Sequence, residues 1–174
     1  MSIVILITGA SHTGKTLLAQ KMLEKYHYPY LSIDHLKMGL IRSGNTKLTI
    51  KDDDALTYYL WPIVREIIKT AIENNQNLIV EGCYVPFAFK KDFDNYYLKN
   101  IKFICLAMTN EYIKNHFHDI LKHASDIENR IKDEECTIEN LQIDNQNIIE
   151  GFKYVGEQVI LIEDDYEKVI QKLL

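Results

Sequence analysis

The sequence of 174 residues contains no long apolar run, since no such run exceeds six residues. A helix that spans a bilayer needs about 20 consecutive apolar residues. The first residues of the chain also lack the basic segment and the long apolar stretch of a signal peptide. We therefore expect a cytoplasmic protein that has no membrane partner.

Cysteine and positive charge are also scarce. The three cysteines, Cys83, Cys105 and Cys136, are far apart and form no C-x-x-C pair, which argues against a disulfide framework or a zinc knuckle. Acidic residues outnumber basic ones by 25 to 20, and the formal net charge is −5. Proteins that bind nucleic acid usually carry a basic face that neutralises phosphates, so we expect no nucleic-acid partner.

Short apolar runs alternate with longer stretches that have helical spacing. The runs lie at residues 3–7, 30–33, 78–80, 101–108 and 159–162. This alternation predicts an α/β fold in which helices connect parallel strands. The length suits a single domain over residues 1–174, and the polar stretch within about 110–156 is expected to form a helical lid, with exposed helices after residue 125.

Four helices can be placed from the apolar spacing. The clearest one begins near Asp53 or Asp54, which are good N-cap residues, and contains Pro62, where we expect a kink. Shorter helices are expected over residues 34–42, 110–123 and 166–174. The predicted buried stripe of the long helix consists of Leu56, Leu60, Ile63, Val64, Ile67, Ile68 and Ala71.

Residues 9–16 read GASHTGKT and match the pattern G-x-x-x-x-G-K-[ST]. They stand between the first apolar run and a helical stretch, which is the strand, loop and helix setting that a phosphate-binding loop requires. Lys15 supplies a charge at the outer phosphates, and Thr16 supplies a hydroxyl for Mg²⁺. The residues expected to contact a nucleoside triphosphate are Gly9, Ser11, His12, Thr13, Gly14, Lys15, Thr16 and Leu17.

Carboxylates follow the second and third expected strands. Asp34 comes directly after residues 30–33, and Glu81 and Gly82 come after residues 78–80. In parallel sheets ligands bind beyond the carboxyl ends of the strands, so both carboxylates are expected beside the outer phosphates and the Mg²⁺. One can accept a proton from a hydroxyl and the other can orient metal-bound water. The alternatives are a helix N-cap for Asp34 and a surface carboxylate for Glu81.

Arginine is rare in the sequence. Of the 20 lysines and arginines, three are arginines, namely Arg42, Arg65 and Arg130. Arginine is suited to paired hydrogen bonds with phosphate or carboxylate, so each of the three is a candidate anion ligand. Tyr58 and Trp61 share a flank of the long helix with Arg65, adjacent to its apolar stripe, and could line a pocket for an anionic or ring-bearing acceptor. The alternative is that Trp61 simply packs the helix.

These motifs together resemble the small P-loop kinases, which include adenylate, shikimate and gluconate kinases and the zeta-toxin-like phosphotransferases. The stretch of residues 30–42, Trp61-Pro62 and residues 80–84 is similar to bacterial proteins labelled 2-phosphoglycerate kinase. The resemblance implies a three-layer P-loop NTPase fold with a five-stranded parallel sheet of order 2-3-1-4-5. It also implies an acceptor site between the Asp34 helix and the long helix, and a lid arginine that closes over the phosphates.

The hypothesis from the sequence is an ATP- and Mg²⁺-dependent kinase that phosphorylates a small anionic metabolite, either a phosphorylated acid or a nucleotide, as a monomer or homodimer. Lys15, Asp34 and Arg130 are expected to be catalytic, and Thr16 and Glu81 are expected to hold Mg²⁺. The acceptor-binding candidates are Asp34, Arg42, Tyr58, Trp61, Arg65, Glu81 and Gly82. The alternative is a nucleotide-binding regulator or an ATPase without an acceptor. The guanine-reading N-K-x-D and ABC signature segments do not occur in the sequence.

Overall fold

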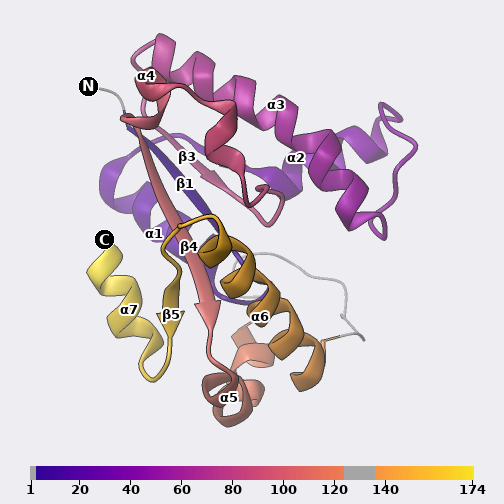
Figure 1. Cartoon of the computed structure of the whole chain (residues 1–174), viewed down its shortest axis with the longest axis vertical. Helices are drawn as coiled ribbons and strands as arrows, with labels where there is room; N and C mark the ends of the chain where they lie inside the picture. Colours follow the sequence, from indigo (N-terminus) through magenta and orange to yellow (C-terminus); the bar gives the residue numbers. More distant parts are fainter. Residues whose placement is uncertain (1–2, 124–135) are drawn as a thin grey trace.

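The computed structural model describes residues 3–123 and 136–174. Five parallel strands form one sheet in the order β2-β3-β1-β4-β5, and helices cover both of its faces (Figure 1). The strands are β1 (Val4–Gly9), β2 (Tyr30–Ser32), β3 (Leu78–Glu81), β4 (Ile101–Met108) and β5 (Ile160–Ile162). The predicted three-layer α/β fold and its strand order are confirmed.

The helices follow the strands along the chain. They are α1 (Lys15–Tyr26), α2 (Ile33–Arg42), α3 (Asp53–Glu73), the 3₁₀ turn η1 (Phe89–Asp92), α4 (Asn95–Leu98), α5 (Asn110–His123), α6 (Ile138–Tyr154) and α7 (Tyr166–Leu173). Among the described residues, no helix is both long enough and apolar enough to cross a membrane.

The central strand β1 explains why the sheet has two covered faces. All six of its residues are buried, as expected for a parallel strand between two helical layers. Leu6 packs in a cluster with α3 and with Phe152 of α6, whereas Ile5 and Ile7 pack with α1 and α7. Each fully buried Leu or Ile side chain contributes roughly 1.5–3 kcal/mol, so this alternation stabilises both layers at once.

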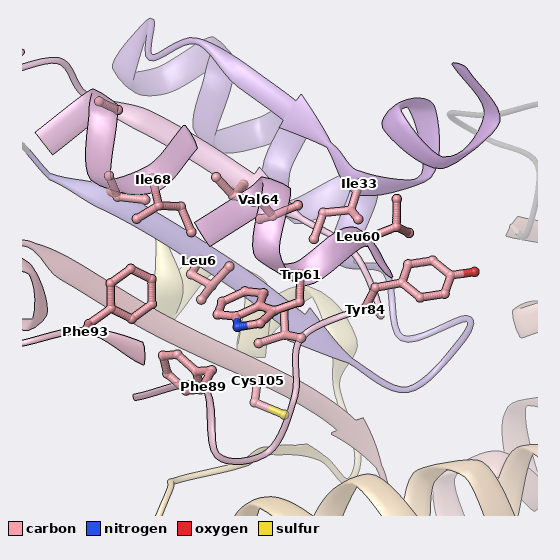
Figure 2. Close-up of a cluster of buried hydrophobic side chains, with 14 of the residues drawn as sticks. Leu6, Ile33, Leu60, Trp61, Val64, Ile68, Tyr84, Phe89, Phe93 and Cys105 are labelled. Carbon is pink, nitrogen blue, oxygen red and sulfur yellow. The ribbon is translucent and has the colours of Figure 1, made fainter. Parts of the chain in front are cut away.

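The long helix α3 differs in detail from the sequence prediction. Trp61 is 4% exposed and lies among Leu6, Phe89 and Phe93, so it belongs to the core instead of flanking it (Figure 2). Its ring meets those of Phe89 and Phe93 edge to face, at centroid distances of 6.2 and 6.1 Å. The predicted stripe was wrong here because 3₁₀ turn η1, which the sequence did not reveal, covers this second face of the helix.

Two other local predictions were wrong. α3 begins at Asp53, as predicted, but its N-cap residue is Asp52 and not Asp53 or Asp54. The Asp52 side chain does not cap the helix, because its carboxylate accepts hydrogen bonds from Thr49. The region after residue 125 was expected to form exposed helices, yet α6 buries Leu141, Asn145 and Phe152. Phe152 is fully buried in the cluster that contains Leu6, so α6 is part of the main core.

Gly9 provides a test of the close packing at the end of β1. Its φ is +139°, and an added Cβ would lie 1.9 Å from the carbonyl oxygen of Leu106 on β4. Gly9→Ala should therefore lower the free energy of unfolding by more than about 2 kcal/mol. Gly39→Ala is the matched control, because Gly39 lies inside α2 with nothing within 4 Å of an added Cβ. That control should raise the free energy of unfolding by roughly 0.5–1 kcal/mol in urea titrations. Equal stability of the two variants would contradict the account.

Candidate active site

The loop between β1 and α1 turns its backbone inward through left-handed conformations. Positive φ angles occur at His12 (63°) and Gly14 (76°). A Cβ on Gly14 would lie 2.0 Å from the hydroxyl oxygen of Tyr166, which approaches from the start of α7. The Thr13 hydroxyl donates to the Ala10 carbonyl at 2.9 Å and fixes the turn. Successive amides at the N-terminus of a helix form a cradle that fits an anionic phosphate.

Lys15 is the first residue of α1 and is 5% exposed. Its ammonium group donates to the carbonyl oxygen of Ala10 at 2.5 Å, so the side chain curls back across the loop. A buried ammonium group in this position can interact with phosphate oxygens that lie in the cradle. The structure therefore places the Lys15 charge at the loop of residues 9–16, and its contact with the outer phosphates stays a prediction.

Thr16 and Glu81 lie next to each other, as predicted for a pair that holds Mg²⁺. The Thr16 hydroxyl donates to Oε1 of Glu81 at 3.4 Å, and the Tyr30 hydroxyl donates to Oε2 at 2.9 Å. Glu81 is the last residue of β3 and is 2% exposed. A hydroxyl and a carboxylate are oxygen ligands of the kind Mg²⁺ prefers, and that ion usually completes its shell with water and substrate phosphates. The residues present therefore fit Mg²⁺.

Asp34 lies in the first turn of α2, immediately beyond β2. The helix is capped by Ser32, whose hydroxyl oxygen accepts from the backbone N–H of His35 at 3.3 Å, so the interpretation of Asp34 as the N-cap is wrong. The ammonium group of Lys37 donates to Oδ1 of Asp34 at 2.5 Å. The Asp34 side chain keeps 35% of its surface exposed and can therefore meet a ligand.

The surroundings of Cys83 show which charged groups gather at this edge of the sheet. Burial raises the pKa of its thiol, Lys15 lowers it, and the carboxylates of Asp34, Glu81 and Asp144 raise it. Gly82 and Cys83 come directly after β3. The backbone of Gly82 lies against the side chain of Ile33. The charges of one lysine and three carboxylates, from four separate segments, thus all act on one thiol.

Asp144 is a site residue that the sequence did not indicate. It lies on α6, and one of its carboxylate oxygens accepts a hydrogen bond of 2.7 Å from the backbone N–H of Ser11 in the phosphate-binding loop. The contact joins residues that are 133 positions apart, and no motif surrounds Asp144. Only the packing of α6 against the sheet could have revealed it.

Arg65, Tyr58 and Trp61 do not form one pocket at this edge. Arg65 bonds to Glu66 and to Asp92, and Asp92 also accepts a hydrogen bond of 2.7 Å from the indole of Trp61. Arg65 lies roughly 18 Å along α3 from Asp53, as expected from a rise of about 1.5 Å per residue. The prediction that Tyr58, Trp61 and Arg65 line one pocket was wrong, because Tyr58 is 79% exposed while Trp61 is in the core.

The other two arginines have different positions. Arg42 is exposed at the last turn of α2, on an element of the expected acceptor site. Arg130, the expected lid arginine, lies outside the described residues, as does the middle of the expected lid. The two ends of that region are the helices α5 and α6.

Arg65 does line an open pocket of about 970 Å³. This pocket lies at the end of the sheet where the parallel strands begin. Pro29, Asn77 and Leu78 also line it, and these residues immediately precede or begin β2 and β3. Because parallel strands all begin at the same edge, this pocket is separated from the phosphate-binding loop by the length of the strands. It therefore does not belong to the candidate site.

The structure resembles solved kinases over nearly its whole length. Against a candidate kinase from Chloroflexus aurantiacus j-10-fl the TM-score is 0.59 at 16% identity, covering 99% of this chain and 96% of the other. A shikimate kinase from Bacteroides thetaiotaomicron gives 0.57 at 16%, covering 98% and 96%. A gluconokinase from Sinorhizobium meliloti 1021 gives 0.53 at 12%, covering 99% and 89%.

No family profile matches the sequence, and no curated protein matches it either. The likeness to the solved kinases therefore concerns the fold. The chain has the fold of these solved kinases, and the loop of residues 9–16 lies at the end of the central strand β1.

Proposed function

We propose that this protein is an ATP- and Mg²⁺-dependent kinase that phosphorylates a hydroxyl group of a small anionic molecule. One observation carries the proposal: the buried ammonium of Lys15, the Thr16–Glu81 pair and Asp34 follow the carboxyl ends of β1, β3 and β2, which are neighbours in the sheet. Phosphoryl transfer depends mostly on positioning and charge stabilisation, and these groups supply both.

Each residue has a defined part in the proposed reaction. Lys15 and the loop amides hold the outer phosphates and stabilise the charge that develops on them. Asp34 accepts the proton as the acceptor oxygen forms its bond to the terminal phosphorus and the bond to the ADP oxygen breaks. Bound Mg²⁺ would neutralise the phosphates, and Thr16 and Glu81 would hold it. Tyr30 orients the Glu81 carboxylate.

The anionic acceptor is proposed to lie between α2 and the start of α3, on the side of Asp34. Arg42 at the end of α2 supports this location, while Arg65 and Trp61 no longer do. The hydroxyl of a phosphorylated acid such as 2-phosphoglycerate is the proposed acceptor group, and a nucleoside monophosphate, which would accept on its phosphate and need no base, is the alternative. We further propose that residues 1–174 act as one cytoplasmic domain, as a monomer or homodimer, with Arg130 closing over the phosphates.

A thermal-shift screen tests the acceptor proposal. The protein is incubated with Mg²⁺ and a nonhydrolysable ATP analogue, together with nucleoside monophosphates, sugar acids, phosphorylated glycerates and aminoglycosides. An anionic acceptor should raise the melting temperature beyond the shift that the nucleotide alone produces. A larger shift with aminoglycosides than with every anion would contradict the proposed acceptor class.

Glu81→Gln should change the dependence of activity on metal. The amide keeps the size of the side chain and loses the charge that would hold Mg²⁺, so half-maximal activity should need a Mg²⁺ concentration about 10-fold higher. Tyr30→Phe, which removes one hydrogen bond to Glu81, should shift the Mg²⁺ dependence in the same direction by a smaller factor. Glu111→Gln on α5 is the control. An unchanged Mg²⁺ titration in Glu81→Gln would exclude Glu81 from the metal site.

A further inference from the structure

A chain of four polar side chains connects the two helices that would enclose the acceptor. Lys37 of α2 donates to Oδ1 of Asp34 at 2.5 Å and to the hydroxyl of Tyr84 at 2.8 Å. The Tyr84 hydroxyl donates in turn to Oδ1 of Asp53, the first residue of α3, at 2.9 Å. The chain thus joins α2, the segment after β3 and the start of α3.

Tyr84 holds the ammonium group of Lys37 in place. Burial raises the pKa of the Tyr84 phenol, and the charges of Asp53 and Asp34 raise it further, so the phenol stays protonated. The phenol donates its one hydrogen bond to Asp53, so the phenol oxygen can accept a hydrogen bond from Lys37. The ammonium nitrogen also lies 4.8 Å from the centre of the Tyr84 ring, at the distance of a cation–π contact.

Both members of the Lys37–Asp34 pair keep capacity for a ligand. An ammonium group has three donors, and within residues 3–123 and 136–174 the hydrogen bonds of Lys37 use two of them. Over the same residues, the Asp34 carboxylate is hydrogen-bonded through Oδ1, and Oδ2 remains able to accept. A donor and an acceptor therefore lie side by side at the start of α2, immediately beyond β2.

We infer that Lys37 determines acceptor specificity by binding the carboxylate of a 2-hydroxy acid. The inference rests on the proposed function and narrows its acceptor to an acid whose free hydroxyl is next to the carboxylate, in place of 2-phosphoglycerate or a nucleotide. The reacting hydroxyl donates to Oδ2 of Asp34, and the carboxylate on the neighbouring carbon accepts from the third N–H of Lys37. The 2.5 Å separation of Asp34 and Lys37 suits groups on adjacent carbons. A charge-assisted bond to Lys37 favours the acid over the corresponding neutral alcohol.

The test compares two acids with their neutral counterparts, glycerate with glycerol and gluconate with glucitol. Binding is measured by calorimetry in the presence of Mg²⁺ and a nonhydrolysable ATP analogue. The wild-type protein should prefer the acid in at least one pair. Lys37→Met should weaken acid binding by roughly 10- to 100-fold, as expected for one hydrogen bond to a charged group. The affinity for the nucleotide analogue should not change. Lys47→Met, an exposed lysine between α2 and α3, is the control.

The outcomes separate this inference from the proposed function. Acid preference that depends on Lys37, without phosphoryl transfer from ATP, would contradict the kinase and leave the recognition pair standing. Equal binding of acid and alcohol, binding of neither, or unchanged preference in Lys37→Met would overturn the inference. If Lys37→Met does not fold, Tyr84→Phe decides, because it leaves Lys37 in place without one of its two acceptors. That variant should also reduce the preference for the acid, and an unchanged preference would overturn the inference.

Discussion

Replacing Lys15 by alanine should lower kcat by roughly 10²–10³ and weaken the binding of Mg²⁺-ATP. Lys15 is buried and bonds to the carbonyl of Ala10, so its ammonium group is already in position at the phosphate-binding loop. Asp34, Glu81 and Asp144, whose charges also act on the Cys83 thiol, are carboxylates and cannot replace the lost positive charge. Turnover is measured by a coupled ADP assay, and nucleotide affinity is measured by calorimetry.

Lys25→Ala is the matched control for this experiment. It removes a lysine from the same helix, at the end that contacts the C-terminal residue Leu174. The control should retain the activity and nucleotide affinity of the wild type. Circular dichroism should show that both variants keep their helices, because alanine is a strong helix former. Wild-type kinetics in Lys15→Ala would remove this residue from the catalytic site.

Asp34→Asn should lower kcat by roughly 10²–10⁴ and leave the affinity for ATP nearly unchanged. The amide oxygen can still accept the hydrogen bond from Lys37, so the local structure should remain, but an amide cannot take up the proton of a hydroxyl. The expected pattern is therefore a large fall in kcat with little change in the KM for ATP.

Asp94→Asn, which changes an exposed aspartate at the N-cap of α4 ahead of β4, is the control for Asp34, because asparagine also caps helices well. It should have wild-type activity. If Asp34→Asn also retained full activity, Asp34 would be a contact for the acceptor and not a base. An acceptor that needs no base, such as a phosphate group, would then be favoured.

The sequence predicted those parts of the site that depend on local pattern and strand topology. The phosphate-binding loop is one continuous segment whose glycines and lysine have fixed spacing, so its position between β1 and α1 followed directly. Asp34 and Glu81 could be brought together because parallel strands end at the same edge of the sheet. Their proximity depends on strand order alone, and that order was confirmed.

The sequence could not predict contacts that depend on how helices pack over the sheet. Asp144 reaches Ser11 only because α6 buries Phe152 against the sheet, and no local pattern indicates this contact. The sequence does not distinguish Lys37 from the other lysines. Its role follows only from its hydrogen bonds to Asp34 and Tyr84. Trp61 was misplaced for the same reason. Periodicity identifies the faces of a helix, but it does not tell which additional face a distant aromatic segment covers.

We propose that this protein transfers the terminal phosphoryl group of ATP to a small acceptor. The most direct measurement is ³¹P NMR of the protein with Mg²⁺-ATP and the acceptors that stabilise it in the thermal-shift screen. A kinase should form one molecule of phosphorylated acceptor for each ADP. This product should disappear in Asp34→Asn. Equal amounts of ADP and inorganic phosphate, whatever acceptor is present, would show an ATPase instead. Tight binding of ATP without turnover would show a regulator, and either result would contradict the account.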